Sequence, residues 1–269
     1  MSCWSSTYDP PPGQGFSLNL IYEIDPSVML VVSLAFFLCG VIKGMTGFGL
    51  HMITVPLLSF SLPLPTAVAL TMIPVLFSNT YLMTQSGHAW QSVRRFWPLM
   101  GVMVITLWFT TRLLVTLDQG ILSSVFGAIN FLYVILIIRG PRFEISPGAE
   151  RWMSPVVGLS AGVIGGATSL FGMPILLYVI ALNPPKEQFV GAVTANYLVG
   201  GVALSVMLAK MDILSGRDAV IAGIGLVPLF AGVAAGQFLR GKASQELFRR
   251  IVLTTLVCIG LAMILRNFL

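Results

Sequence analysis

Long stretches without charged residues recur along this chain, and they constrain its fold more than any other feature. Only 9% of the residues are charged and 56% are hydrophobic, against about 25% and roughly 45–50% in soluble domains. Most stretches approach or exceed the roughly 20 apolar residues that a helix needs to cross a bilayer. We therefore predict an all-α, polytopic helical membrane protein. The apolar or nearly apolar stretches are residues 28–42, 50–62, 66–86, 96–117, 121–138, 152–181, 189–209, 219–239 and 251–265.

The remaining composition excludes several classes of protein. Residues 1–27 contain no lysine or arginine, so they do not resemble a signal peptide and are predicted to form a tail. Cys39 and Cys258 lie inside apolar stretches, which argues against a disulfide framework. The formal net charge of +5 is read as a sign of membrane topology. Since no basic arm occurs, no nucleic-acid partner is expected.

The chain contains an internal duplication. Several glycines and a proline recur at one constant spacing: Gly40, Gly44, Gly47 and Pro56 match Gly158, Gly162, Gly165 and Pro174. The repeat predicts a single transmembrane domain with a tail (1–27), a first repeat (28–139), an inter-repeat loop (140–151) and a second repeat (152–269).

The arginines and lysines orient the two repeats oppositely. Arg94 and Arg95 follow the third stretch of the first repeat, whereas Arg240, Arg249 and Arg250 follow the fourth stretch of the second. Because cytoplasmic loops carry an excess of Lys and Arg, the repeats are predicted to be inverted. Both termini are then expected outside, with loops 87–95, 139–151 and 240–250 inside. Inverted repeats are typical of secondary transporters.

The first two stretches of each repeat are short and flank a glycine cluster. We predict about eight transmembrane segments, made of six full spans plus two broken or re-entrant helix pairs. Ten full crossings are the alternative. The helices are expected to be interrupted at Gly47 and Gly165, and to resume near Leu50 and Thr168. The free N–H groups and positive dipole ends there would suit an anion.

The candidate binding residues cluster at the two breaks. Lys43 is the basic residue well inside the first repeat's apolar core, where a charge costs at least about 2.5–3.5 kcal/mol; snorkelling to the interface is the alternative. His51 could bind solute or relay a proton, or pack as a hydrogen-bonded core residue, and Ser169 takes its place in the second repeat. The other candidates are Gly44, Thr46, Gly47, Gly49, Asn79, Gly162, Gly165, Gly166, Thr168, Thr194 and Asn196.

Each of these residue types also has a structural explanation. Gly40/Gly44 and Gly158/Gly162 are Gly-x-x-x-Gly pairs of the kind found where helices pack closely. Threonine and serine side chains could cap the half-helices. Asparagines such as Asn79 and Asn196 commonly link neighbouring membrane helices.

Two runs resemble the sulfite exporter TauE/SafE family of membrane transporters. The first is residues 40–58, with Val55-Pro56-Leu57-Leu58 after the break, and the second is residues 158–177, with Met173-Pro174-Ile175-Leu176-Leu177. The duplication, the length and Thr194-Ala195-Asn196 match as well. The resemblance implies secondary transport of sulfite, a sulfonate such as sulfoacetate, or a related small organic anion across a bacterial cytoplasmic membrane.

Rival functions and partners stay open in part. A passive anion channel would use the same polar breaks. An intramembrane enzyme is disfavoured, because no Cys/His metal spacing or Gly-x-Ser-x-Gly elbow occurs, and no cofactor is expected. No nucleotide-binding loop occurs, so a proton or sodium gradient, or the solute's own gradient, would drive movement. The lipid bilayer and a small anionic solute are the expected partners, and a homo-oligomer is compatible with the sequence.

Overall fold

The computed structural model describes residues 26–46, 50–139 and 145–240, together with residue 254. Every element in these ranges is a helix, which confirms the predicted all-α fold. The first half contains α2 (Pro26–Thr46), α3 (Leu50–Ser59), α4 (Leu64–Ser86), α5 (Ala89–Thr110), α6 (Leu113–Thr116) and α7 (Gln119–Arg139). The second half contains α8 (Pro147–Thr168), α9 (Gly172–Ala181), α10 (Lys186–Lys210), α11 (Gly216–Ile224) and α12 (Leu226–Arg240).

The helices have the lengths and compositions of membrane spans. Within the described ranges, 4 helical stretches are long and apolar enough to cross a bilayer, namely Leu64–Ser86, Trp90–Thr116, Glu187–Lys210 and Asp218–Leu239. They coincide with four of the six predicted full spans. A fifth predicted span, residues 121–138, lies within α7, and the last one, residues 251–265, lies outside the described residues except for Thr254.

Several helices extend beyond their apolar stretches into segments predicted as loops. Arg94 and Arg95 lie in the first two turns of α5, and Glu150 and Arg151 lie in the first turns of α8. Hydropathy alone placed the starts of α5 and α8 too late in the chain, because a charged helix end can project beyond the apolar part of a span. Arg95 Nε and Glu150 Oε1 form a salt bridge of 2.6 Å that links the two helix ends.

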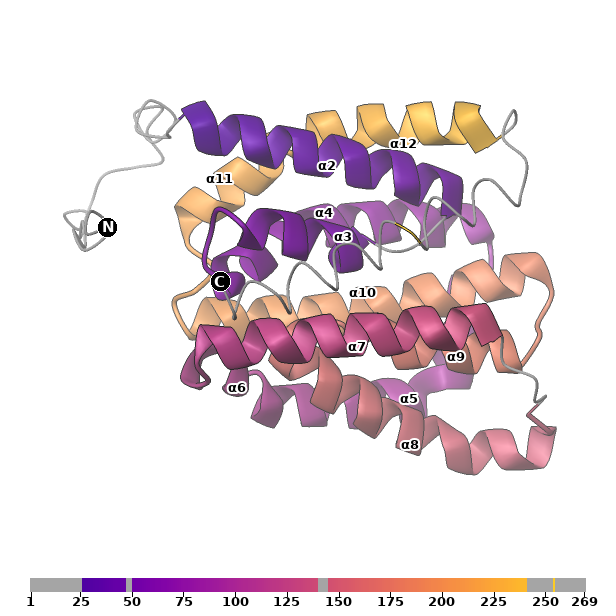
Figure 1. Cartoon of the computed structure of the whole chain (residues 1–269). Coiled ribbons are helices and arrows are strands. Elements are labelled where there is room, and N and C mark those ends of the chain that lie inside the picture. The colour runs from indigo at the N-terminus through magenta and orange to yellow at the C-terminus, as the bar shows by residue number, and fades with distance from the viewer. Residues whose placement is uncertain (1–25, 47–49, 140–144, 241–253, 255–269) are drawn as a thin grey trace.

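Two long helix pairs each join one helix of the first half to one helix of the second half, and we call them the crosswise pairs. Helix α2 packs along α12, and its counterpart α8 packs along α5, as Figure 1 shows. A Cβ on Gly40 would stand 2.3 Å from Leu229 O, and a Cβ on Gly158 would stand 2.4 Å from Leu99 O. Both helix pairs therefore depend on glycines at corresponding positions for backbone contact, as in Gly-x-x-x-Gly interfaces.

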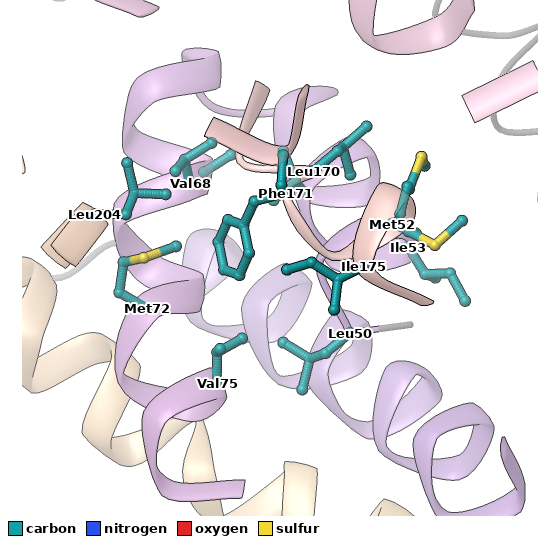
Figure 2. Packing of buried hydrophobic residues seen from close by; sticks show 14 of the residues in the cluster. Leu50, Met52, Ile53, Val68, Met72, Val75, Leu170, Phe171, Ile175 and Leu204 are labelled. Atoms are coloured by element: carbon teal, nitrogen blue, oxygen red, sulfur yellow. The ribbon is translucent and has the colours of Figure 1, made fainter. Parts of the chain in front are cut away.

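Helices α4 and α10 pack together between these two crosswise pairs, and the short helices α3 and α9 lie against them. Large apolar side chains are buried here, while others are exposed around the outside, such as Trp90, Trp152 and Val227. An apolar exterior is what a lipid environment accommodates. Figure 2 shows the Phe171 ring in the interior near Met72 and Val75 of α4, with Leu50 and Ile175 also close by.

Candidate functional site

Described residues that flank the two predicted breaks line one cavity, which we call the break cavity. It has a volume of about 30 Å³, which is room for about two waters, since one water needs roughly 10–15 Å³ on this measure. Its polar side chains are those of Lys43, His51, Asn79, Ser169 and Tyr197. Its remaining lining comes from Leu50, Met52, Val75, Leu170, Phe171, Gly172 and Met173. Residues from α2, α3, α4, α9 and α10 and from the second break thus surround one small space.

The second break lies later than predicted. Helix α8 continues through Gly165 to Thr168, so the predicted interruption at Gly165 was wrong. The chain turns at Ser169, whose φ of 63° is left-handed, and α9 begins at Gly172 rather than near Thr168. A Cβ on Gly165 would stand 2.4 Å from Phe171 Cβ. Because Gly165 has no side chain, Phe171 can pack directly against α8 at this position.

The first predicted break, at Gly47, falls within residues 47–49, which the structure does not describe. Helix α2 ends at Thr46 and α3 begins at Leu50, while Gly47 and Gly49 lie outside the described residues. The later end of α8 also affects the predicted correspondence of residues between the two repeats. His51 lies in the first turn of α3, whereas Ser169 precedes α9, so the two do not occupy equivalent places.

The N-termini of both short helices line the break cavity. Leu50 and His51 begin α3, and Gly172 and Met173 begin α9. Each helix has 10 residues, and the first N–H groups of a helix lack intrahelical partners. Met173 N donates to Leu170 O at 3.2 Å, but no side chain caps α9. Two helix ends that carry partial positive charge therefore face the same space.

Lys43 is buried in the last turn of α2, with 5% of its surface exposed. Its Nζ donates to Ser78 Oγ at 2.9 Å and to Asn79 Oδ1 at 3.3 Å, both on α4. The salt bridge found in the described part of the chain joins Arg95 to Glu150, so Lys43 has no carboxylate partner there. The side chain is buried rather than snorkelling, and its hydrogen-bond partners among the described residues are neutral oxygens.

Two other polar groups in the break cavity lack partners among the described residues. They are His51 Nε2 and Ser169 Oγ, which are both buried. The His51 ring contacts Phe171 edge-on, with centroids 5.8 Å apart. Leaving a buried polar group unpaired costs about 1–3 kcal/mol. An ammonium and two polar atoms without partners among the described residues can each form a hydrogen bond to a polar ligand.

The other predicted site residues lie elsewhere. Gly44 packs against Val233 O, Gly162 against Thr106 and Gly166 against Thr110, which is the close-packing alternative for these glycines. Thr168 Oγ1 donates to Ile164 O and accepts from Leu170 N, and Thr194 Oγ1 donates to Val190 O. Asn196 Nδ2 donates to Ala192 O, and its Oδ1 is unpartnered but does not line the break cavity. Thr46 ends α2, and its side chain lies outside the described part of the chain.

Sequence reasoning missed three residues of this site. Ser78 holds the Lys43 ammonium, and it stands beside Asn79, which was selected. Tyr197 lines the break cavity and donates to Gly172 O at 2.8 Å, and it stands beside Asn196. Phe171 contacts the rings of both His51 and Tyr197. The signal that could have found Ser78 and Tyr197 was their position next to a selected polar residue in an apolar helix.

No metal centre is evident in the described part of the chain, where no three His, Cys, Asp or Glu side chains gather. The family model described as "Sulfite exporter TauE/SafE" matches residues 32–263. That match includes both breaks and all the helices that line the break cavity. Neither the curated proteins nor the solved structures gave a match to this chain.

Proposed function

This chain belongs to the sulfite exporter TauE/SafE family, and from that premise we propose that it transports a small anion which binds in the break cavity. Sulfite, a sulfonate or a related organic anion is the expected solute. Movement would be secondary, driven by a gradient, because the chain has no nucleotide-binding loop. The bacterial cytoplasmic membrane is the expected location.

One observation carries this proposal, namely that the buried Lys43 side chain has no carboxylate partner among the described residues. An isolated buried charge is costly, so buried charges are normally paired or bound to a ligand. An anion in the break cavity would supply the counter-charge. It would also have the unpartnered His51 Nε2 and Ser169 Oγ within the same lining, and the two helix N-termini would add to the attraction.

The lining also indicates the kind of anion. Lys43 is the charged side chain among the described residues that line the break cavity, so a monoanion would be neutralised while a dianion would remain negative. The rest of the lining is mostly apolar, with Val75, Phe171 and Met173 among its residues. A compact anionic head with little or no apolar tail fits this combination.

Transport by purified protein in liposomes tests the proposal. Uptake of labelled sulfite, sulfoacetate and taurine would be measured with and without an imposed pH gradient, and protein-free liposomes give the background. Sulfite uptake above that background is expected, with taurine lower because its net charge is zero. If none of the three solutes enters faster than the background, the proposed function is wrong for this solute class.

An exchange experiment separates a transporter from a passive anion channel. Liposomes would be loaded with unlabelled sulfite before labelled sulfite is added outside. Alternating access to one site predicts that the internal solute accelerates uptake of the label, because a loaded site returns. Uptake that follows only the concentration difference and the membrane potential would favour the channel.

A further inference from the structure

Lys43 also lines a second cavity, which uses a neighbouring face of α4. This cavity has a volume of about 70 Å³ and is formed by α2, α4 and α12. We call it the α12 cavity. Its lining includes Ser78, Tyr81, Phe230 and Gln237 in addition to Lys43.

Lys43 belongs to the lining of both cavities. Its acceptor Asn79 lines the break cavity, and its acceptor Ser78 lines the α12 cavity. The side chain is thus anchored by one oxygen from each side. An anion that moved from one cavity to the other would remain next to the same positive charge throughout.

The α12 cavity reaches the surface near the end of α12. Gln237 is exposed and lies within the last turn of this helix, which ends at Arg240. The Tyr81 and Phe230 rings meet edge-on at the cavity wall, with centroids 6.3 Å apart. Gly44 contacts the Val233 backbone, where a Cβ would stand 2.2 Å from the carbonyl oxygen. Helices α2 and α12 are therefore closely apposed at that point.

We propose that the solute path leaves the break cavity past Lys43, crosses the α12 cavity and opens to water at Gln237. This inference rests on the proposed function. The physical reason is that Lys43 would compensate the charge of the anion along this path, because an unpaired anion in an apolar interior would cost several kcal/mol. The Lys43 ammonium would exchange its Asn79 contact for the solute on one side and its Ser78 contact on the other. Gln237 and Ser78 are then residues of the path.

The test places one cysteine in the path. Cys3, Cys39 and Cys258 are first replaced by serine or alanine, and Gln237→Cys is added. A small, negatively charged methanethiosulfonate reagent is expected to modify this cysteine, to reduce labelled sulfite flux to the level of protein-free liposomes, and to react more slowly when sulfite is present. In the Lys43→Met background that protection by sulfite should disappear.

The matched control is Phe238→Cys, which is the next residue on α12 and does not line the α12 cavity. Its modification should leave sulfite flux unchanged. Two results would overturn the path: failure of the reagent to modify Gln237→Cys from either side, or modification without loss of flux. If neither the protein of natural sequence nor the unmodified, cysteine-replaced protein showed sulfite flux, that result would instead count against the proposed function.

Discussion

Lys43 Nζ lies 2.9 Å from Ser78 Oγ, and this contact joins the end of the first broken helix to the middle of α4. The same amino group lies 3.3 Å from Asn79 Oδ1. Two adjacent residues of one helix thus hold a buried charge from neighbouring directions. The arrangement fixes the ammonium in place without a counter-charge from the described residues.

Replacing Lys43 by methionine should strongly reduce anion transport while the protein remains folded. A hydrogen bond to a charged group contributes about 1.5–3 kcal/mol, so anion affinity should fall roughly 10- to 150-fold. Stability should be kept or increased, because methionine removes an unpaired buried charge at similar volume. Binding of sulfite and the melting temperature of purified protein would be measured together. Unchanged affinity in a folded variant would assign Lys43 a structural role.

The unpartnered groups of the break cavity should affect binding without affecting stability. His51→Phe and Ser169→Ala remove His51 Nε2 and Ser169 Oγ, which have no hydrogen-bond partner among the described residues. Each should weaken sulfite binding roughly two- to ten-fold, since a neutral hydrogen bond contributes about 0.5–1.5 kcal/mol, and the melting temperature should hardly change.

Asn79→Leu is the contrasting variant. It removes an acceptor of Lys43, so both sulfite binding and the melting temperature should fall. If His51→Phe and Ser169→Ala lowered the melting temperature as much as Asn79→Leu, these groups would have internal partners and the binding role would be lost.

The glycines of the crosswise helix pairs should tolerate no added methyl group. Gly40→Ala and Gly158→Ala each place a Cβ against a backbone carbonyl that cannot move aside, and overpacking of this kind costs about 1–3 kcal/mol. Gly101→Ala and Gly223→Ala are matched controls, because a Cβ at either helical position meets nothing within 4 Å. Thermal unfolding in detergent would compare the four. Equal melting temperatures would show that the close contacts contribute nothing.

Solute charge gives a separate prediction. With Lys43 as the charged side chain of the described break cavity, methanesulfonate should compete with labelled sulfite better than sulfoacetate, which carries a second negative charge. A second buried charge without a partner would be costly. Competition would be measured at one pH and constant ionic strength. Stronger competition by sulfoacetate would require another cation in the site.

The predicted topology can be tested at two open glycine positions. A Cβ at Gly148 or at Gly216 meets nothing within 4 Å, so cysteine should be tolerated at both in the cysteine-replaced protein. Gly148 belongs to a loop segment predicted inside, and Gly216 begins α11 on the side predicted outside. An impermeant thiol reagent applied to intact cells should label Gly216→Cys and spare Gly148→Cys. The reverse pattern would invert the orientation.

How far the sequence predicted this site depended on the kind of signal. Lys43 and His51 were recognisable because a titratable residue in an apolar stretch is costly and therefore conspicuous. The position of the second break was predicted wrongly, since glycines permit a break but do not force one. In the structure Phe171 packs on Gly165, and α8 continues to Thr168. Asn196 was preferred to Tyr197 because sequence alone does not give the rotation of a helix about its axis.

The crosswise packing of the halves has a consequence for how the protein is made. Gly40 of α2 finds its partner only when Leu229 of α12 has been synthesised, which takes roughly 10–40 s at about 5–20 residues per second. During that interval the glycine face of α2 lacks the α12 backbone that it contacts in the folded protein. The inserted chain therefore stays partly assembled in the membrane or bound to a chaperone. Assembly of the first half is therefore completed after translation of most of the second, and a separately expressed amino-terminal half should be degraded.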